Sequence, residues 1–222
     1  MKPRDFQIVL QKKLSGIYEV QEAGAIAARY LSDRFGLSTT QLLLNEELPL
    51  TPEEEANIDG DVQQLLAHVP VQQVVGFELF CGHRFKVNGD TLIPRPETED
   101  LVQLATEKCC GALSNILDVG TGSGCIAISL AKALPLARVV AWDISEGALQ
   151  VAQENATTLG ARVDFELRDL LKEADAPTLA PHSLDAIVSN PPYIPEEEAQ
   201  TMEAQVVNHE PHSALFVPND NP

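Results

Sequence analysis

The residue pattern with the clearest chemical potential is a glycine-rich segment, Asp118-Val119-Gly120-Thr121-Gly122-Ser123-Gly124. Glycine permits positive φ and lets the backbone approach a bound molecule closely. A helix that begins after such a loop offers free N–H groups to an anion. The dinucleotide fingerprint needs glycine or alanine where this chain has Cys125, so the segment does not match it. The acid before the loop, Asp118, would repel a pyrophosphate and could hold an ammonium group.

A second acid, Asp143, ends the next predicted strand. A carboxylate in this position can accept hydrogen bonds from the hydroxyls of a ribose. The loop and this acid together favour an adenosine with a zwitterionic tail and no phosphate, and S-adenosylmethionine fits that description. Its carboxylate would meet the helix N-terminus, and its ammonium would lie near Asp118. The alternative is that Asp143 only caps the following helix, in competition with Ser145.

Three neighbouring residues complete the predicted adenosine site. Ile144 could pack on a face of the adenine, and Asp169, after the third predicted strand, could accept a hydrogen bond from the adenine amino group. Leu170 would offer its backbone N–H to a ring nitrogen. Because acids in loops are common, Asp169 could instead be a solvated surface charge, and Ile144 could belong to the core.

The segment Asn190-Pro191-Pro192-Tyr193 follows the fourth predicted strand. Its prolines fix φ and remove two N–H donors, so the turn is stiff. The Asn190 carboxamide and the Pro191 carbonyl could hold both hydrogens of a planar –NH₂ group, and Tyr193 offers it a flat face. We predict that Asn190, Pro191 and Tyr193 are catalytic and that the whole turn, with Pro192, binds the substrate. The alternative is an ordinary proline-rich loop.

The chemistry of this turn would be methylation of a conjugated, weakly nucleophilic nitrogen. Asn190 does not titrate, so it would orient the nitrogen toward the methyl carbon and would not deprotonate it. The main contribution is proximity and orientation.

The elements that position these residues alternate between strand and helix. Strands are predicted at 116–119, 138–142, 162–167 and 184–189, and helices at about 97–109, 125–134 and 146–159. This alternation predicts an α/β fold with a parallel sheet and helices on both faces. Ligands of such sheets bind beyond the carboxyl ends of the strands.

Residues 1–75 are predicted to be a small helical bundle that serves as a docking module. Apolar residues recur there at helical spacing. Two capping-box patterns, Ser38 with Gln41 and Thr51 with Glu54, predict helix starts.

Residues 76–94 are predicted to be a hairpin that links this bundle to a second domain at 95–222. Apolar and polar residues alternate around Gly82, and Asn88-Gly89 is a turn signal. The prolines that follow stop any regular element before the helix at Glu97.

Composition narrows the classes of partner. The 222-residue chain has 33 acidic and 15 basic side chains and a formal charge of −18. Such a chain repels phosphate backbones, so direct nucleic-acid binding is not expected, although a local basic patch could override the net charge. No apolar run reaches the ~20 residues of a membrane-spanning helix. Without a signal peptide, CxxC spacing or clustered histidines, we expect a cytoplasmic protein with no metal site and no disulfide framework.

Several segments resemble a known family, the release-factor glutamine methyltransferases, also called HemK or PrmC. They are Thr91 to Glu99 (TLIPRPETE), Asp118 to Gly124, Asp143-Ile144-Ser145, and Ser189 to Ile194. Glu210-Pro211 with Ala214-Leu215 also looks like the family's stretch after the turn. The resemblance covers about residues 70–217. The first segment is the most specific to the family, because amino-methylating nucleic-acid enzymes share the Asn-Pro-Pro-Tyr turn.

This resemblance implies a Rossmann-like class I methyltransferase sheet, preceded by the helical bundle and the hairpin. It implies an S-adenosylmethionine-dependent protein-(glutamine-N5) methyltransferase, which modifies the glutamine in the Gly-Gly-Gln loop of class I peptide-chain release factors. The implied cofactor contacts are Gly120 to Gly124, Asp143, Leu170 and Asn190, and Asn190 to Tyr193 would hold the glutamine. Arg95 and Glu97 would lie near the methionine end of the pocket.

Two alternatives stay open. A nucleic-acid amino-methyltransferase, acting on N6 of adenine or N2 of guanine, would share the turn but should carry a basic face. Residues 151–222 instead hold 3 basic and 13 acidic side chains. A sheet of this class has seven strands and four are predicted before Pro222, so we also expect that the methyltransferase domain is incomplete. A non-catalytic binding fragment is therefore the other alternative.

Overall fold

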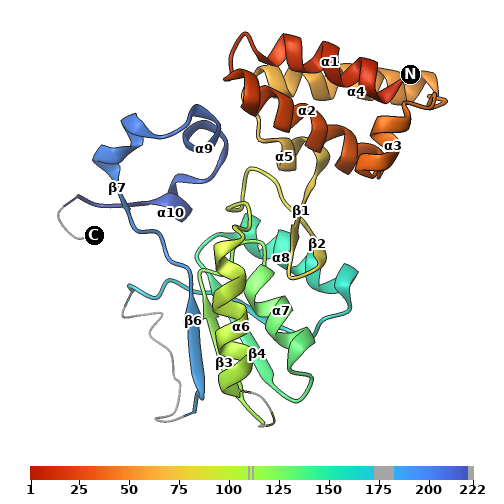
Figure 1. Cartoon of the computed structure of the whole chain (residues 1–222). Helices are drawn as coiled ribbons and strands as arrows, with labels where there is room; N and C mark the ends of the chain where they lie inside the picture. Colours follow the sequence, from red (N-terminus) through yellow and green to blue (C-terminus); the bar gives the residue numbers. More distant parts are fainter. Residues whose placement is uncertain (110, 112, 173–182, 220–222) are drawn as a thin grey trace. The chain divides into compact units, whose positions relative to one another are not determined.

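The computed structural model describes residues 1–109, 111, 113–172 and 183–219. The chain divides into two compact units, Met1–Gly76 and Phe77–Pro222 (Figure 1). Each has its own hydrophobic core. Cys110, one of the four cysteines of the chain, lies outside the described residues. No helix in the described part of the chain has the length and apolar character needed to cross a membrane.

The first unit is a helical bundle, as the sequence predicts. Its helices are α1 (Pro3–Leu14), α2 (Val20–Phe35), α3 (Thr39–Leu44), α4 (Pro52–Leu66) and α5 (Val71–Val75). Both predicted capping boxes are confirmed. The N–H of Gln41 donates to Ser38 Oγ over 3.3 Å, and Gln41 Oε1 accepts from the N–H of Ser38 over 2.9 Å. Thr51 and Glu54 pair in the same way at the start of α4.

The second unit begins with a hairpin of β1 (Phe77–Phe80) and β2 (His83–Lys86). Its tight turn is formed by Cys81 and Gly82, which both have positive φ, +47° and +74°, the geometry that suits the twist of a two-residue hairpin. The Asn88-Gly89 signal belongs to a separate turn, in which Asn88 Oδ1 accepts from the N–H of Asp90 over 2.9 Å. Because Phe80 and Phe85 pack in the core of the second unit, the hairpin groups with that unit.

A four-stranded sheet forms the centre of the second unit. Its strands are β3 (Asn115–Val119), β4 (Arg138–Asp143), β5 (Asp164–Leu167) and β6 (Ala186–Ser189). They lie in the order β5-β4-β3-β6, and every pair is parallel. The predicted parallel sheet is therefore confirmed. Figure 1 shows the helices packed across these strands: α6 (Glu97–Cys109), α7 (Cys125–Ala133) and α8 (Glu146–Leu159).

The described helices α6, α7 and α8 all pack on one face of the sheet. Ile116, Val139 and Val188 point to one face of the sheet and share a core with residues of α6, α7 and α8. On the opposite face, Ile187 is 66% exposed. Right-handed crossovers explain this, because β3, β4 and β5 follow one another in a single direction across the sheet. The return from β5 to β6 runs through residues 173–182, which lie outside the described part.

After β6 the chain forms a segment of short elements. They are β7 (Ile194–Pro195), the 3₁₀ helix η2 (Glu196–Thr201), α9 (Ala204–His209), α10 (His212–Leu215) and β8 (Phe216–Val217). β7 and β8 pair in parallel, with Ile194 opposite Phe216. The acids Glu196 to Glu198 occupy the first turn of η2, where negative charge suits the positive helix end.

Candidate active site

A cavity of about 540 Å³ lies beyond the carboxyl ends of the four parallel strands. This volume is within the ~300–1,000 Å³ typical of small-molecule sites. The loops after β3, β4, β5 and β6 contribute to its lining, as do residues of 90–98 and 211–218. Of the residues predicted from the sequence, it brings together Arg95, Gly120, Thr121, Gly122, Ser123, Asp143, Ile144, Asp169, Leu170, Asn190, Pro191 and Pro192.

The glycine loop joins β3 to α7. Gly120, Gly122 and Gly124 have φ of +72°, +56° and +80°, a region that side chains rarely adopt. A Cβ at Gly122 would meet no atom within 4 Å, whereas one at Gly124 would lie 2.9 Å from Ile128 Cδ1 and 3.0 Å from Ala152 Cβ. Gly122 thus keeps the cavity open, and Gly124, which does not line it, lets α7 pack closely against α8.

Asp143 fixes the glycine loop to the end of β4. Its Oδ2 accepts from the N–H of Gly122 over 2.8 Å, and its Oδ1 accepts from the N–H of Ser145 over 2.9 Å. Ser145, not Asp143, caps α8, because its Oγ accepts from the N–H of Ala148. Each carboxylate oxygen has more than one lone pair, so Asp143 can still accept from a ligand in the cavity.

Asp118 lies beneath the glycine loop and outside the cavity lining. It is fully buried, and its Oδ2 accepts from Thr121 Oγ1 over 2.6 Å. Burial raises the pKa of Asp118 to about 7, the hydrogen bond from Thr121 opposes this, and the charge of Asp143 adds to it. An ammonium group in the cavity would therefore contact the glycine loop, which lies between the cavity and Asp118.

The loops after β4 and β5 present aliphatic side chains at the cavity. Ile144 is 62% exposed and Leu170 is 53% exposed, so both can cover an apolar, flat group. Asp169 also lines the cavity, but its oxygens are engaged within its own loop. Oδ1 accepts from the N–H of Leu171 over 3.0 Å, and Oδ2 pairs with Lys172 Nζ at 3.1 Å. These contacts lower the pKa of Asp169, with the Lys172 hydrogen bond as the largest cause.

The Asn190 turn begins where β6 meets the cavity. Ser189 Oγ donates to the carbonyl of Val119 over 2.7 Å and so ties the end of β6 to the end of β3. Among the described residues, the Asn190 carboxamide makes no hydrogen bond, so both its groups are available. Pro191 and Pro192 line the cavity with it. Tyr193 lies outside the lining, and it is 72% exposed.

Some lining residues were not predicted from the sequence. These include Thr91 and Trp142. Thr91 Oγ1, Trp142 Nε1 and the Oγ of the predicted Ser123 are buried polar atoms without a hydrogen-bond partner in the described structure. Unpaired buried polar atoms are costly, and a polar ligand in the cavity would give them partners. Together with the open space at Gly122, they fit S-adenosylmethionine. Thr91 begins the first family segment, and no signal marks Trp142.

The thiol that lines the cavity is a neutral group. Burial raises the pKa of Cys125 to about 12, so the protonated form dominates at neutral pH and a thiolate nucleophile is not available. No group of three or more histidine, cysteine or acidic side chains in the described residues could hold a metal ion.

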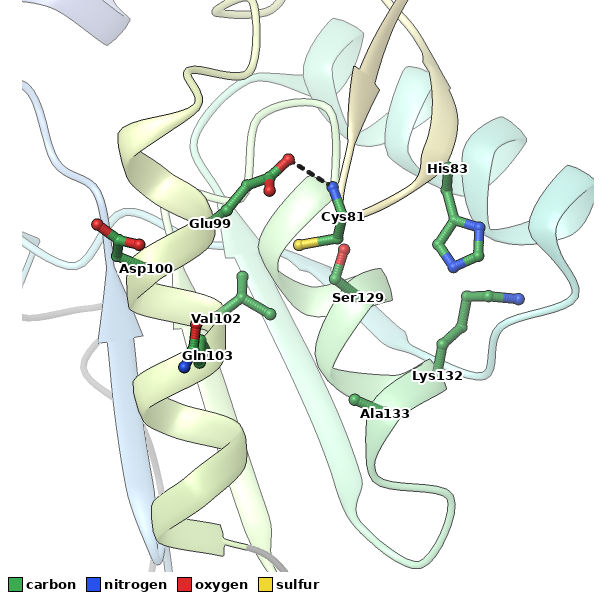
Figure 2. Close-up of a pocket in the computed structure, with 9 residues that line it drawn as sticks. All are labelled: Cys81, His83, Glu99, Asp100, Val102, Gln103, Ser129, Lys132 and Ala133. Carbon is green, nitrogen blue, oxygen red and sulfur yellow. Dashed lines mark hydrogen bonds between the residues drawn. The ribbon is translucent and has the colours of Figure 1, made fainter.

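A second cavity, of about 460 Å³, lies beside the hairpin turn between α6 and α7. Figure 2 shows Cys81 and Ser129 between Glu99 of α6 on one side and His83 with Lys132 on the other. The N–H of Cys81 donates to Glu99 Oε1 over 2.8 Å. Burial raises the pKa of the Cys81 thiol, so this thiol is also neutral. The two cavities share no lining residue.

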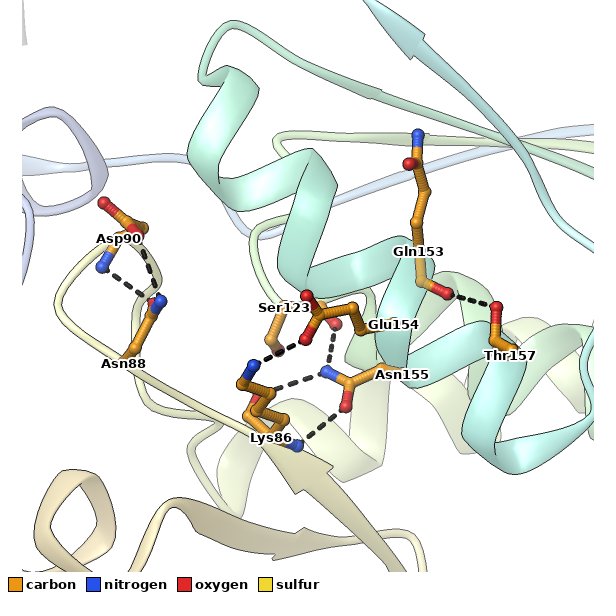
Figure 3. A network of polar contacts seen from close by, with 8 residues as sticks. All are labelled: Lys86, Asn88, Asp90, Ser123, Gln153, Glu154, Asn155 and Thr157. Atoms are coloured by element: carbon orange, nitrogen blue, oxygen red, sulfur yellow. Dashed lines mark hydrogen bonds and ion pairs between the residues drawn. The ribbon is translucent and has the colours of Figure 1, made fainter.

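A buried asparagine of α8 supports the glycine loop from behind. Asn155 is 2% exposed, and Figure 3 shows its carboxamide between the end of β2 and the loop. Its Nδ2 donates to the carbonyl of Ser123 over 2.9 Å and to that of Lys86 over 3.1 Å. Its Oδ1 accepts from the N–H of Lys86 over 2.7 Å. Asn155 therefore joins the hairpin, α8 and the loop in one polar network.

Comparison with known proteins defines first the class and then the family. The family described as methyltransferase small domain matches residues 98–215, which include the whole sheet, and the family described as PrmC N-terminal domain matches residues 10–76. The second unit therefore has the class I methyltransferase fold.

Proteins of similar sequence identify the family within this class. Release factor glutamine methyltransferase of Bacteroides thetaiotaomicron is 40% identical over 213 residues, which cover 96% of this chain and 75% of the relative. The enzyme of the same name from Enterococcus faecalis is 42% identical over 93% of this chain and 73% of the relative. That of Flavobacterium psychrophilum is 36% identical over 98% of this chain and 76% of the relative. The chain belongs to the release factor glutamine methyltransferase family.

Proposed function

We propose that the protein transfers a methyl group from S-adenosylmethionine to the side-chain amide nitrogen of the glutamine in the Gly-Gly-Gln loop of class I peptide-chain release factors. The observation that carries this proposal is the cavity itself. It combines the glycine loop and Asp143, which suit the cofactor, with a rigid turn whose Asn190 carboxamide has no partner among the described residues.

The cofactor site is proposed to use the loops after β3, β4 and β5. The Gly120–Gly124 loop would approach the methionine part, and Asp143 would accept from the ribose hydroxyls. Ile144 and Leu170 would cover the adenine. When bound there, S-adenosylmethionine supplies an electrophilic methyl group on a sulfonium.

The Asn190 turn is proposed to orient the acceptor. The carboxamide oxygen of Asn190 and the carbonyl of Pro191 accept the two hydrogens of the glutamine –NH₂, which aims the nitrogen lone pair at the cavity. Pro191 and Pro192 keep the turn stiff, so the turn loses little conformational entropy when the substrate binds. Because Asn190 stays neutral, its contribution is orientation and not proton transfer.

The partner is proposed to be a protein and not a nucleic acid. The formal charge of −18 opposes binding to phosphate backbones. Release factors act on ribosomes, so the protein would work in the cytoplasm.

A labelling assay tests the proposal. The protein is incubated with tritiated S-adenosylmethionine and, in separate reactions, with a class I release factor, RNA or DNA. We expect label on the release factor alone. Label on RNA or DNA and none on the release factor would overturn the proposal in favour of a nucleic-acid amino-methyltransferase, and a folded protein that binds no cofactor would favour a binding fragment.

A further inference from the structure

Glu210 is a charged side chain in the interior of the second unit. Its side chain is 1% exposed, although it lies in the segment that follows the Asn190 turn. Oε2 accepts from the backbone N–H of Ile93 over 3.0 Å, and Oε1 accepts from Arg95 Nη2 over 2.6 Å. Burying a carboxylate is unfavourable unless its oxygens are paired. Both oxygens are paired here, and both partners come from one stretch of chain.

The two segments that Glu210 joins are separate parts of the cavity lining. Residues 91, 92, 94 and 95 contribute to the lining from the hairpin side, and Pro211, immediately after Glu210, is followed by lining residues up to 218. The segments are more than a hundred residues apart in sequence. Glu210 therefore holds together two parts of the lining that no shared helix or sheet connects.

The segment after Glu210 also pairs with the strand that follows the Asn190 turn. β8 pairs with β7, so Phe216 lies opposite Ile194 and Val217 opposite Pro195. β7 begins directly after Tyr193. The front of the turn is anchored by the bond from Ser189 Oγ to Val119. The turn is thus fixed at one end by the sheet and at the other by a segment whose position depends on Glu210.

We propose that Glu210 is a positioning residue for methyl transfer, acting through Ile93, Arg95 and the β7–β8 pair to fix the Asn190 turn over the cavity. The loops after β3 and β4 do not depend on it. Gly120 and Thr121 donate their N–H groups to the carbonyl of Trp142, at 2.9 and 3.0 Å, and Asp143 holds Gly122. Loss of Glu210 should therefore lower kcat and leave cofactor affinity nearly intact.

Two variants separate the contacts of Glu210. Glu210→Ala removes both hydrogen bonds. Glu210→Gln keeps an oxygen for the N–H of Ile93, but its –NH₂ group cannot accept from Arg95. Val139→Ala is the control for lost stability, because Val139 is 2% exposed in the sheet and does not line the cavity.

The inference rests on the proposed function, so the wild-type protein is first assayed on a release factor. We then expect Glu210→Ala to lower kcat by roughly 10- to 100-fold, the loss that a misplacement of about 1 Å can cause. The dissociation constant of S-adenosylmethionine, measured by calorimetry, should change by less than about 3-fold, which is under 1 kcal/mol. Glu210→Gln should lose less kcat than Glu210→Ala.

Hydrogen exchange gives a readout that is independent of activity. The N–H of Ile93 should exchange faster in Glu210→Ala and remain protected in Glu210→Gln and Val139→Ala. If Glu210→Ala does not fold, Glu210→Gln carries the same kinetic comparison. A kcat loss equal to that of Val139→Ala, or an equal loss of kcat and cofactor affinity, would overturn the inference. An inactive wild-type protein with normal exchange at Ile93 would instead contradict the proposed function.

Discussion

Asp143 accepts hydrogen bonds from the backbone amides of Gly122 and Ser145, and it also lines the cavity. It can therefore bind a ligand while it holds the glycine loop. The sequence predicted that Asp143, the glycine loop and the Asn190 turn meet, because each follows a parallel strand and strand ends share one edge. It could not predict that Asp118 lies beneath the loop or that Tyr193 lies outside the lining. Those positions depend on how α7 and β7 pack.

We expect Asp143→Ala to weaken S-adenosylmethionine binding by about 10- to 100-fold, because charge-assisted hydrogen bonds contribute roughly 1.5–3 kcal/mol. Calorimetric titration measures this directly. Asp169→Ala is the matched control, since the Asp169 oxygens are bonded to Leu171 and Lys172, and it should have a smaller effect. An unchanged dissociation constant in Asp143→Ala would contradict the ribose contact.

Asp118 should make stability depend on pH. Its pKa in the folded protein is raised from 3.8 to about 7, so the folded state binds its proton more tightly than the unfolded chain. The contribution of Asp118 to the free energy of unfolding therefore falls as the pH rises from 3.8 to about 7, and it is constant above that pH. The free energy of unfolding of Asp118→Asn, taken relative to that of the wild type, should be about 2–3 kcal/mol higher at pH 8 than at pH 5. Urea denaturation at both pH values checks this, and parallel profiles for the two proteins would contradict it.

The elements of the second unit were predicted well where local signals set their ends. α6 runs from Glu97 to Cys109 and α8 from Glu146 to Leu159, as predicted, because prolines, Ser145 and Gly160 set their ends. Strand ends were predicted less accurately, and β5 begins at Asp164 although the strand was predicted from residue 162. The face on which each helix packs depends on strand order, which the sequence alone did not reveal.

Two glycines of one loop should respond differently to alanine. Gly124→Ala places a Cβ 2.9 Å from Ile128 at positive φ, so we expect roughly 2–5 kcal/mol of destabilisation from strain and overpacking. Gly122→Ala meets no protein atom and should cost only the strain, about 1–2 kcal/mol, yet its methyl group would occupy ligand space. Thermal denaturation and cofactor titration of both variants separate these effects. Similar stability loss in both would contradict the distinction.

At the scale of the whole molecule, the chain has two separate cores. The buried residues of the first unit and those of the second form distinct clusters. The sequence predicted this division from the change of periodicity after residue 75. It assigned the hairpin to a linker, because two short strands do not reveal where their aromatic side chains pack.

Leu14 tests the independence of the two cores. It is fully buried in the first unit, so Leu14→Ala should destabilise that unit by about 2–5 kcal/mol. We expect cofactor affinity to remain unchanged, because every residue that lines the cavity belongs to the second unit. Differential scanning calorimetry and cofactor titration measure the two properties. A loss of affinity that parallels the loss of stability would show that the units fold as one.

The most direct test of the central claim is tandem mass spectrometry of a release factor after incubation with S-adenosylmethionine and either the wild type or Asn190→Ala. The wild type should add one methyl group to the glutamine of the Gly-Gly-Gln loop. The variant should add none, although it still binds the cofactor with only modestly reduced affinity. Full methylation by Asn190→Ala, or a methyl group on another residue, would contradict the account.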